Sequence, residues 1–218
     1  MARRHHNTRI PLRGGPSFRR QGGQRPVRQL ALLVCEDEKS VPDYLHALCV
    51  HLHINTAAVR NPPNTRGSAP ISVVRFAAEK YQLDGGYDHT FCIFDKDEHE
   101  SYNRALREIE IFASRANNPI PMRAITSVPC FEFWLLLHFE PVTRPMRLCA
   151  DVIARLQRHI PGYVKGANDI FDVLLPRTDT AIRNARLVRR QQAASRAENP
   201  LTNFDQLIEQ LRLLADAA

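Results

Sequence analysis

The sequence predicts an α/β fold, with a mainly parallel central sheet flanked by helices and a helical C-terminal extension. Three observations lead to this prediction. Strand-like and helix-like segments alternate along the first half of the chain, two of the strands end abruptly in charged residues, and only helical patterns continue beyond residue 128. The 218 residues are enough for one sizeable domain with a proper hydrophobic core.

Four short apolar segments predict the strands. Residues 30–35 carry hardly a polar atom, which is typical of a strand buried on both faces. Residues 54–59 and 89–94 are similar runs, and residues 122–125 follow the turn NNPIP. Their alternation with helices favours parallel strands joined by right-handed crossovers.

Helices are predicted over 41–52, from 68 to about 81, and over about 101–116, because apolar residues recur there at intervals of three and four. Pro42 suits a first helical turn, and the segment NPPNTRG (61–67) reads as a loop. The apolar positions that share a helix face are Tyr44, Leu45, Leu48 and Leu52, then Ile71, Val74, Ala77, Ala78 and Tyr81, then Ala105, Leu106, Ile109 and Phe112.

The second half of the chain is predicted to be helical. Residues 131–139, FEFWLLLHF, are apolar on most sides and indicate a buried helix, with Glu132 and His138 as polar exceptions. Further helices are expected at about 147–160, 168–175, 179–196 and 203–216, with no convincing strand. The expected organisation is a disordered basic arm (1–28), an α/β core (29–127) and a helical half packed on that core (128–218).

The net charge of +7 arises from the N-terminal arm. Residues 1–28 hold eight arginines and no acidic residue, which leaves 22 basic and 23 acidic residues in the rest of the chain. Such an arm, rich in Arg, Gly and Pro, is not expected to pack, and it can bind RNA or DNA through counterion release. A solubilising arm, or one that docks on an acidic partner, is the alternative.

The composition points to a cytoplasmic protein without a membrane span. No apolar run approaches the roughly 18 residues that a transmembrane helix needs, and the N-terminus lacks the apolar segment of a secretory signal. The five cysteines are widely spaced and form no CxxC pair, which favours reduced core residues over a disulfide or zinc framework.

Carboxylates follow two of the predicted strands. Glu36 comes directly after strand 30–35, and Asp95 and Asp97 follow strand 89–94. If the two strands are neighbours in a parallel sheet, these groups meet at its carboxyl edge, where they suit Mg²⁺ or Mn²⁺ and phosphoryl transfer. Lys39 or Lys96 then stabilises charge on the phosphate. The alternative is that both acidic tips are solvated strand ends.

Three segments resemble the RloB-like family. CEDEKSVPDYLHAL (35–48) is similar to its EGEKTEPNYF-type opening, FDKDEH (94–99) to its DxD segment, and SVPCFEFWLLLHF (127–139) to its NPCFELWLLLHF-type signature. Similar segments also occur at Tyr163 with Lys165, at 181–188 and at 199–211, so the resemblance covers nearly all of residues 25–212.

The resemblance implies a Toprim-like fold and a magnesium-dependent, nuclease-like site. The family includes the AbiL-type abortive-infection proteins and is associated with phage-defence loci. The positions that match its acidic motifs are Glu36, Asp95 and Asp97, and Glu132 matches the acid of the FExW motif. Glu132 is then either a fourth metal ligand or a carboxylate that faces the helix dipole.

The chain departs from the family pattern in the opening motif. Asp37 stands where glycine is usual, so a turn with positive φ is less comfortable there, and Ser40 and Val41 stand where Thr and Glu are usual. The second acid of that motif is therefore missing.

A row of arginines on helix 179–196 is a candidate phosphate track. Arg183, Arg186 and Arg190 share a face, and Tyr163 and Lys165 are expected to contribute to the same surface. A solvated cationic face is the alternative. His51, His53 and His99 show no metal spacing and are expected to be solvated or hydrogen-bonded.

The expected function is a metal-dependent nuclease that cleaves RNA, including tRNA, or DNA during bacterial phage defence. Lys39, Glu36, Asp95 and Asp97 are its expected catalytic residues. Nucleic acid and other components of a defence operon are the expected partners. Two alternatives stay open, namely a catalytically silent binding subunit of a defence system and a primase-type nucleotidyl transferase.

Overall fold

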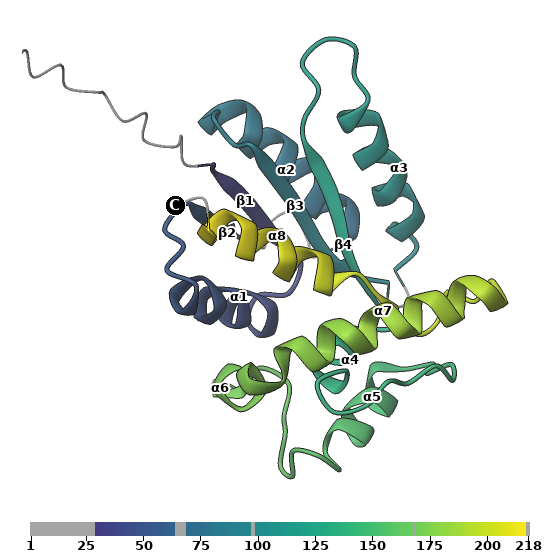
Figure 1. Cartoon of the computed structure of the whole chain (residues 1–218). Coiled ribbons are helices and arrows are strands. Elements are labelled where there is room, and N and C mark those ends of the chain that lie inside the picture. The colour runs from purple at the N-terminus through teal and green to yellow at the C-terminus, as the bar shows by residue number, and fades with distance from the viewer. Residues whose placement is uncertain (1–28, 64–68, 97–98, 168, 217–218) are drawn as a thin grey trace, which may run out of the picture.

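The computed structural model describes residues 29–63, 69–96, 99–167 and 169–216. A five-stranded sheet in the order β2-β1-β3-β4-β5 lies at its centre (Figure 1). The pairs β1·β2, β1·β3 and β3·β4 are parallel, and only β5 pairs antiparallel, with β4. The prediction of an α/β fold with a mainly parallel sheet is confirmed. The strands are β1 (Ala31–Cys35), β2 (Ala57–Arg60), β3 (His89–Asp95), β4 (Met122–Val128) and β5 (Leu201–Thr202).

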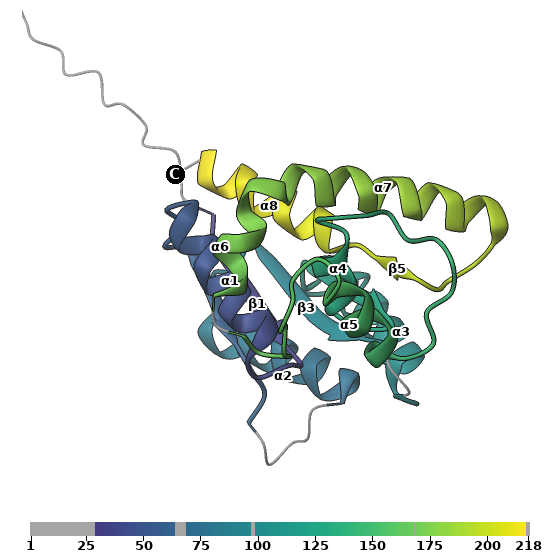
Figure 2. The same ribbon diagram turned by 90° about the horizontal axis from the view of Figure 1, so that it is seen from below.

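Helices cover both faces of this sheet. Helices α2 and α3 lie on one face, whereas α1 and α8 lie on the other, and α4 and α5 lie beyond the carboxyl ends of the strands (Figures 1 and 2). The helices are α1 (Ser40–His51), α2 (Pro70–Asp84), α3 (Tyr102–Ala113), α4 (Glu132–Leu136), α5 (Cys149–Leu156), α6 (Ile170–Leu174), α7 (Thr178–Ser195) and α8 (Phe204–Asp216), with a 3₁₀ turn at Leu175–Arg177. No helix in these ranges is both long and apolar enough to cross a membrane.

Strand β1 divides its side chains between two hydrophobic cores, because successive residues of a strand point to opposite faces. Leu32 and Val34 pack against α2 and α3. Leu33 and Cys35 belong to the other core, which is shared by α1 and the C-terminal helices. All five residues of β1 are fully buried, which explains why the strand is uniformly apolar.

The C-terminal half contains a strand that the sequence pattern does not predict. Strand β5 has two residues and extends the sheet beyond β4, which itself runs to Val128 rather than ending at residue 125. The hydroxyls of Ser127 and Thr202 lie 3.0 Å apart across this pair. So short a strand, held partly by side-chain contacts, leaves no alternating pattern in the sequence.

Helix α4 is shorter than predicted because its last turn tightens. The amides of His138 and Phe139 donate to the carbonyls three residues earlier, at Leu135 and Leu136. Such i→i+3 bonds are common where a helix ends. The apolar run 131–139 is therefore one α-helical turn followed by a 3₁₀-like turn, and both are buried.

His138 is fully buried in this segment and its ring is neutral. Its Nδ1 donates to the carbonyls of Trp134 and Leu135, at 3.1 and 3.2 Å, so the proton resides on Nδ1. Burial lowers the pKa of His138 to about 4. The imidazolium form would have to give up its hydration without gaining an anionic partner.

The free energy of unfolding should therefore fall as the pH is lowered from about 6.5 to about 4. In that window the unfolded chain binds a proton at His138 that the folded chain does not, which costs roughly 1 kcal/mol of stability for each pH unit. Urea unfolding of the wild type and of His138→Phe, compared at several pH values, measures this contribution. The exposed His46→Gln is the control, and a difference between wild type and His138→Phe that does not change with pH would contradict the assignment.

Candidate functional site

The order of the strands creates a crevice at one edge of the sheet. The chain leaves β1 towards β2 on one side and returns through α2 to β3 on the other side, so the connections diverge between β1 and β3. Ligands of open α/β sheets bind at such a switch point, beyond the carboxyl ends of the strands. A cavity of about 390 Å³ lies there, and its lining includes Glu36, Asp95, His99, Ser127 and Lys165.

The carboxylate of Glu36 joins the ends of the two central strands. The amide of Asp95 donates to Glu36 Oε2 at 3.0 Å, and the amide of Glu36 donates to the carbonyl of Ile93 at 2.9 Å. Asp95 in turn accepts a bond at Oδ2 from the amide of Phe131, at 3.1 Å, just before α4. Glu36 and Asp95, which the sequence predicts as partners, therefore lie side by side.

The electrostatic environment of Asp95 disfavours its charged form. Burial raises the pKa of the Asp95 carboxyl well above its usual range, and the negative charges of Glu132 and Glu36 raise it further. The Phe131 amide and the Lys165 ammonium oppose this shift. A carboxylate in such a position favours binding of a cation.

Asp37 lies two residues before the N-cap of α1, Lys39, and its carboxylate holds the start of this helix. Its Oδ2 accepts bonds from the amides of Val41 and Lys39, at 2.9 and 3.2 Å. The described non-glycine residues with positive φ are His53, Asn118 and Arg196, so the backbone strain considered for Asp37 does not arise. The aspartate thus accepts a bond from an amide of the first helical turn, and Val41, which donates it, is apolar and lines the cavity.

Asn61 holds the loop after β1, although the sequence pattern assigns it only to a loop of its own. Its Nδ2 donates to the carbonyl of Cys35 at 2.9 Å and to that of Asp37 at 2.6 Å. It follows β2 directly, as Glu36 follows β1, and Ser127 occupies the equivalent end of β4. Reading the residue after every parallel strand would have found it.

The lysine in the cavity is Lys165, not Lys39. Lys165 lines the cavity and lowers the pKa values of Asp95 and Glu132. Lys39, predicted as catalytic, lies against Gly166 instead, where an added Cβ would come within 3.0 Å of its side chain. Gly166 has φ +77°, so both its conformation and this contact favour glycine. Lys96 pairs with Glu198 at 2.9 Å.

His99, which the sequence pattern predicts only as a solvated or hydrogen-bonded residue, lies beside Glu36. Its Nε2 lies 3.5 Å from Glu36 Oε1, and its side chain is 43% exposed at the rim of the cavity. Asp97, the second acid of the DxD segment, lies outside the described residues, as does the arm 1–28.

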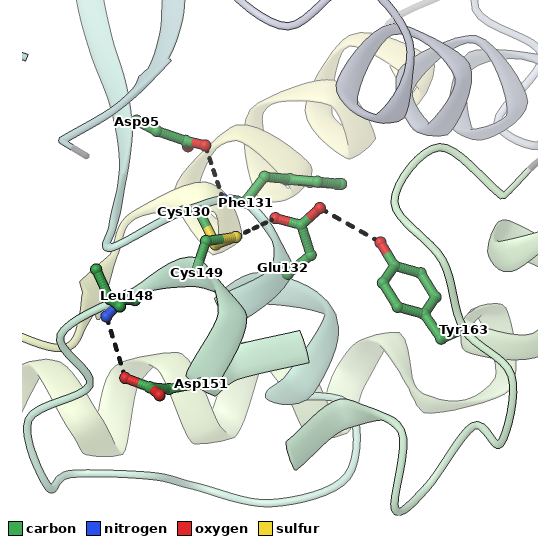
Figure 3. Close-up of a disulfide and its surroundings, with 8 residues drawn as sticks. All are labelled: Asp95, Cys130, Phe131, Glu132, Leu148, Cys149, Asp151 and Tyr163. Atoms are coloured by element: carbon green, nitrogen blue, oxygen red, sulfur yellow. Dashed lines mark hydrogen bonds between the residues drawn. A yellow bond between two sulfur atoms is a disulfide. The ribbon is translucent and has the colours of Figure 1, made fainter. Parts of the chain in front are cut away.

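Glu132 lies behind Phe131 rather than in the lining of the cavity. Its carboxylate is fully buried, with Oε1 3.4 Å from the hydroxyl of Tyr163 and Oε2 3.1 Å from Cys149 Sγ (Figure 3). Burial raises the pKa of the Glu132 carboxyl, and Lys165 opposes the shift. Tyr163 is only 3% exposed, so it supports Glu132 instead of forming part of a surface track.

Two of the five cysteines are paired. Cys130 and Cys149 form a disulfide between the start of α4 and the start of α5, with their Cα atoms 5.6 Å apart (Figure 3). The prediction of reduced cysteines is therefore wrong for this pair, because residues 19 positions apart in the sequence meet only through the packing of the two helices. Cys35, Cys49 and Cys92 are free and buried, as predicted.

The arginines of α7 divide between surface and structural positions. Arg183, Arg186 and Arg190 are exposed, and Arg186 also pairs with Glu209 of α8. Arg189 makes two bonds to the fully buried Asp205, at 2.5 and 2.9 Å, and thereby ties α7 to α8. In the described part of the chain, none of these side chains lines the cavity.

Fold and site together define an α/β protein with a carboxylate-lined cavity at the switch point of its sheet. A model of the RloB-like protein family matches residues 31–211, and the chain belongs to that family. Searches of curated proteins and of solved structures found no match. The matched region includes the sheet, the cavity and the C-terminal helices.

Replacing Asp37 should lower the free energy of unfolding without disrupting the sheet. Asp37→Ala deletes the hydrogen bonds from the amides of Lys39, before α1, and of Val41, in its first turn, and should cost about 1 kcal/mol, whereas Asp37→Asn keeps an acceptor and should cost less. Chemical denaturation of the three proteins measures the difference. An alanine variant as stable as the wild type would contradict a role for Asp37 in holding the start of α1.

Proposed function

We propose that the chain is a metal-dependent nuclease that hydrolyses phosphodiester bonds of RNA, including tRNA, or of DNA, in phage defence. The observation that carries the proposal is the meeting of Glu36 and Asp95 with Lys165 at the switch point of the sheet. Membership of the RloB-like family and the resemblance of its motifs to a Toprim-type site support the same activity.

The residues present fit a magnesium or manganese ion. Glu36 and Asp95 offer hard oxygen donors, as these ions prefer, and the cavity is open enough for water and phosphate ligands. The pKa of Asp95 is raised because the Phe131 amide and Lys165 only partly offset the cost of burying its negative charge. A bound divalent ion would supply that compensation and stabilise negative charge on a transferring phosphoryl group.

The side chains divide the remaining work. Glu36 accepts the proton of the attacking water, and His99, 3.5 Å away, orients the Glu36 carboxylate. Asp95 would hold the cation, and the Phe131 amide fixes the orientation of its carboxylate. Lys165 contacts a phosphate oxygen. The exposed Arg183 and Arg190, on α7, contribute phosphate contacts that position the nucleic acid.

Glu36→Gln and Asp95→Asn should each lower cleavage at least 100-fold, because the first removes the general base and the second a metal ligand. The assay is degradation of total RNA and of plasmid DNA in Mg²⁺ or Mn²⁺, with a chelator control. Asp43→Asn, an exposed carboxylate on α1 away from the cavity, should leave the rate unchanged.

The outcomes separate the nuclease from its rivals. If the wild type and the variants all fail to cleave in every metal, the proposal is contradicted and a catalytically silent binding subunit is favoured. The apolar Val41 in the cavity lining is consistent with that alternative. A binding module should also keep its nucleic-acid affinity in both variants. Incorporation of labelled nucleotides, instead of hydrolysis, would favour primase-type nucleotidyl transfer.

Lys165→Met should lower the cleavage rate by roughly 100-fold, since it removes the positive charge that acts on the carboxylates of Asp95 and Glu132. Lys39→Met is the matched control, because this side chain lies against Gly166, and its rate should stay within about twofold of the wild type. Initial rates at saturating metal measure both. The opposite pattern, with Lys39 essential and Lys165 dispensable, would overturn the assignment.

A further inference from the structure

Three metal-ligating side chains lie together outside the proposed catalytic cavity. One ligand atom each from Cys130, Glu132 and Cys149 lies within 4.8 Å of the others. Cys130 and Glu132 are fully buried and Cys149 is half-buried. The three side chains are fixed by the starts of two helices, because Glu132 is the first residue of α4 and Cys149 the first of α5 (Figure 3).

When the disulfide is formed, Cys149 cannot donate a hydrogen bond to the Glu132 carboxylate. Its Oε2 lies 3.1 Å from Cys149 Sγ, and a disulfide sulfur carries no hydrogen to donate. Oε2 therefore receives no hydrogen bond from Cys149, whereas Tyr163 donates to Oε1 and the charge of Lys165 offsets part of the burial cost. The thiol of a reduced Cys149 can donate a hydrogen bond to Oε2, and a bound cation can neutralise its charge more completely.

We propose that the reduced chain binds one zinc-type cation through Cys130, Cys149 and Glu132. Two thiolates and a carboxylate suit borderline-soft divalent ions such as Zn²⁺, and three protein ligands leave a fourth position for water. Zinc–sulfur bonds of about 2.3 Å in a tetrahedral arrangement need the sulfurs roughly 3.8 Å apart, which side-chain rotation from Cα atoms 5.6 Å apart permits.

This site differs in chemistry from the cavity at the sheet edge. The cavity offers oxygen donors to a hard cation, whereas the cluster offers sulfur. Phe131 lies between them, since its amide binds Asp95 while the neighbouring Cys130 and Glu132 face Cys149. Tyr163 holds the other oxygen of Glu132 and fixes the carboxylate for binding.

Loading of the site requires reduction first. A phosphine reductant supplies two electrons to the disulfide and becomes a phosphine oxide, with its oxygen and the two thiol hydrogens coming from one water molecule. The metal then binds as both thiols release their protons to solvent. Oxidised protein cannot bind in this way because its sulfurs are not thiolates.

Cobalt titration of the phosphine-reduced full chain tests the proposal. We expect one Co²⁺ per chain, an intense thiolate-to-cobalt charge-transfer band, and loss of that band when Zn²⁺ is added. Cys149→Ser should abolish the band and Glu132→Gln should weaken cobalt binding at least tenfold. Cys49→Ser, which removes a free buried thiol on α1, and Asp95→Asn should both retain the band.

Several results would overturn the proposal. These are a reduced wild type without the band, a band that survives Cys149→Ser, and equal cobalt binding by protein that was never reduced. The readout is independent of nuclease activity, so loss of cleavage in Glu36→Gln bears on the catalytic cavity alone.

Discussion

The hydrogen bond between the Asp95 amide and the Glu36 carboxylate is the constraint on which the site depends. It links the ends of β1 and β3, where the backbone hydrogen bonds between the two strands stop. Glu36 and Asp95, 59 positions apart in sequence, thereby lie side by side in the cavity lining. Parallel strands alone bring their carboxyl ends to one edge. This bond fixes the side chain of Glu36 within that edge, and the Phe131 amide fixes Asp95 in the same way.

The central sheet and its acidic edge were predictable because their signals are local. A buried parallel strand needs an uninterrupted apolar run, and a polar residue directly after it marks the strand end, as Glu36 and Asp95 do. Asn61 also follows a strand directly, but it opens the loop segment NPPNTRG and so reads as a loop residue in the sequence. Alternation with helices indicated parallel strands, but that β1 and β3 are neighbours comes from the structure.

Other features depend on contacts that no local pattern records. Lys165 reaches the cavity from a segment between α5 and α6, and its partners are distant in sequence. Strand β5 has two residues, and the Cys130–Cys149 pair arises only when α4 and α5 pack. Arg186 and Arg189 pair with acidic residues of α8, and these pairs depend on where α8 packs against α7.

Residues 130–132 connect the carboxylate-lined cavity with the Cys130, Glu132 and Cys149 cluster through one short stretch of backbone. The amide of Phe131 binds Asp95 on one side, and Cys130 and Glu132 face Cys149 on the other. The negative charge of Glu132 also raises the pKa of Asp95, while Lys165 acts on both carboxyls. Any change in the charge near Glu132 therefore alters the electrostatic potential at Asp95. If the proposed cation binds, Glu36 and Asp95 would supply much of its coordination, because Val41 contributes no acid and Asp37 accepts a bond from the Val41 amide.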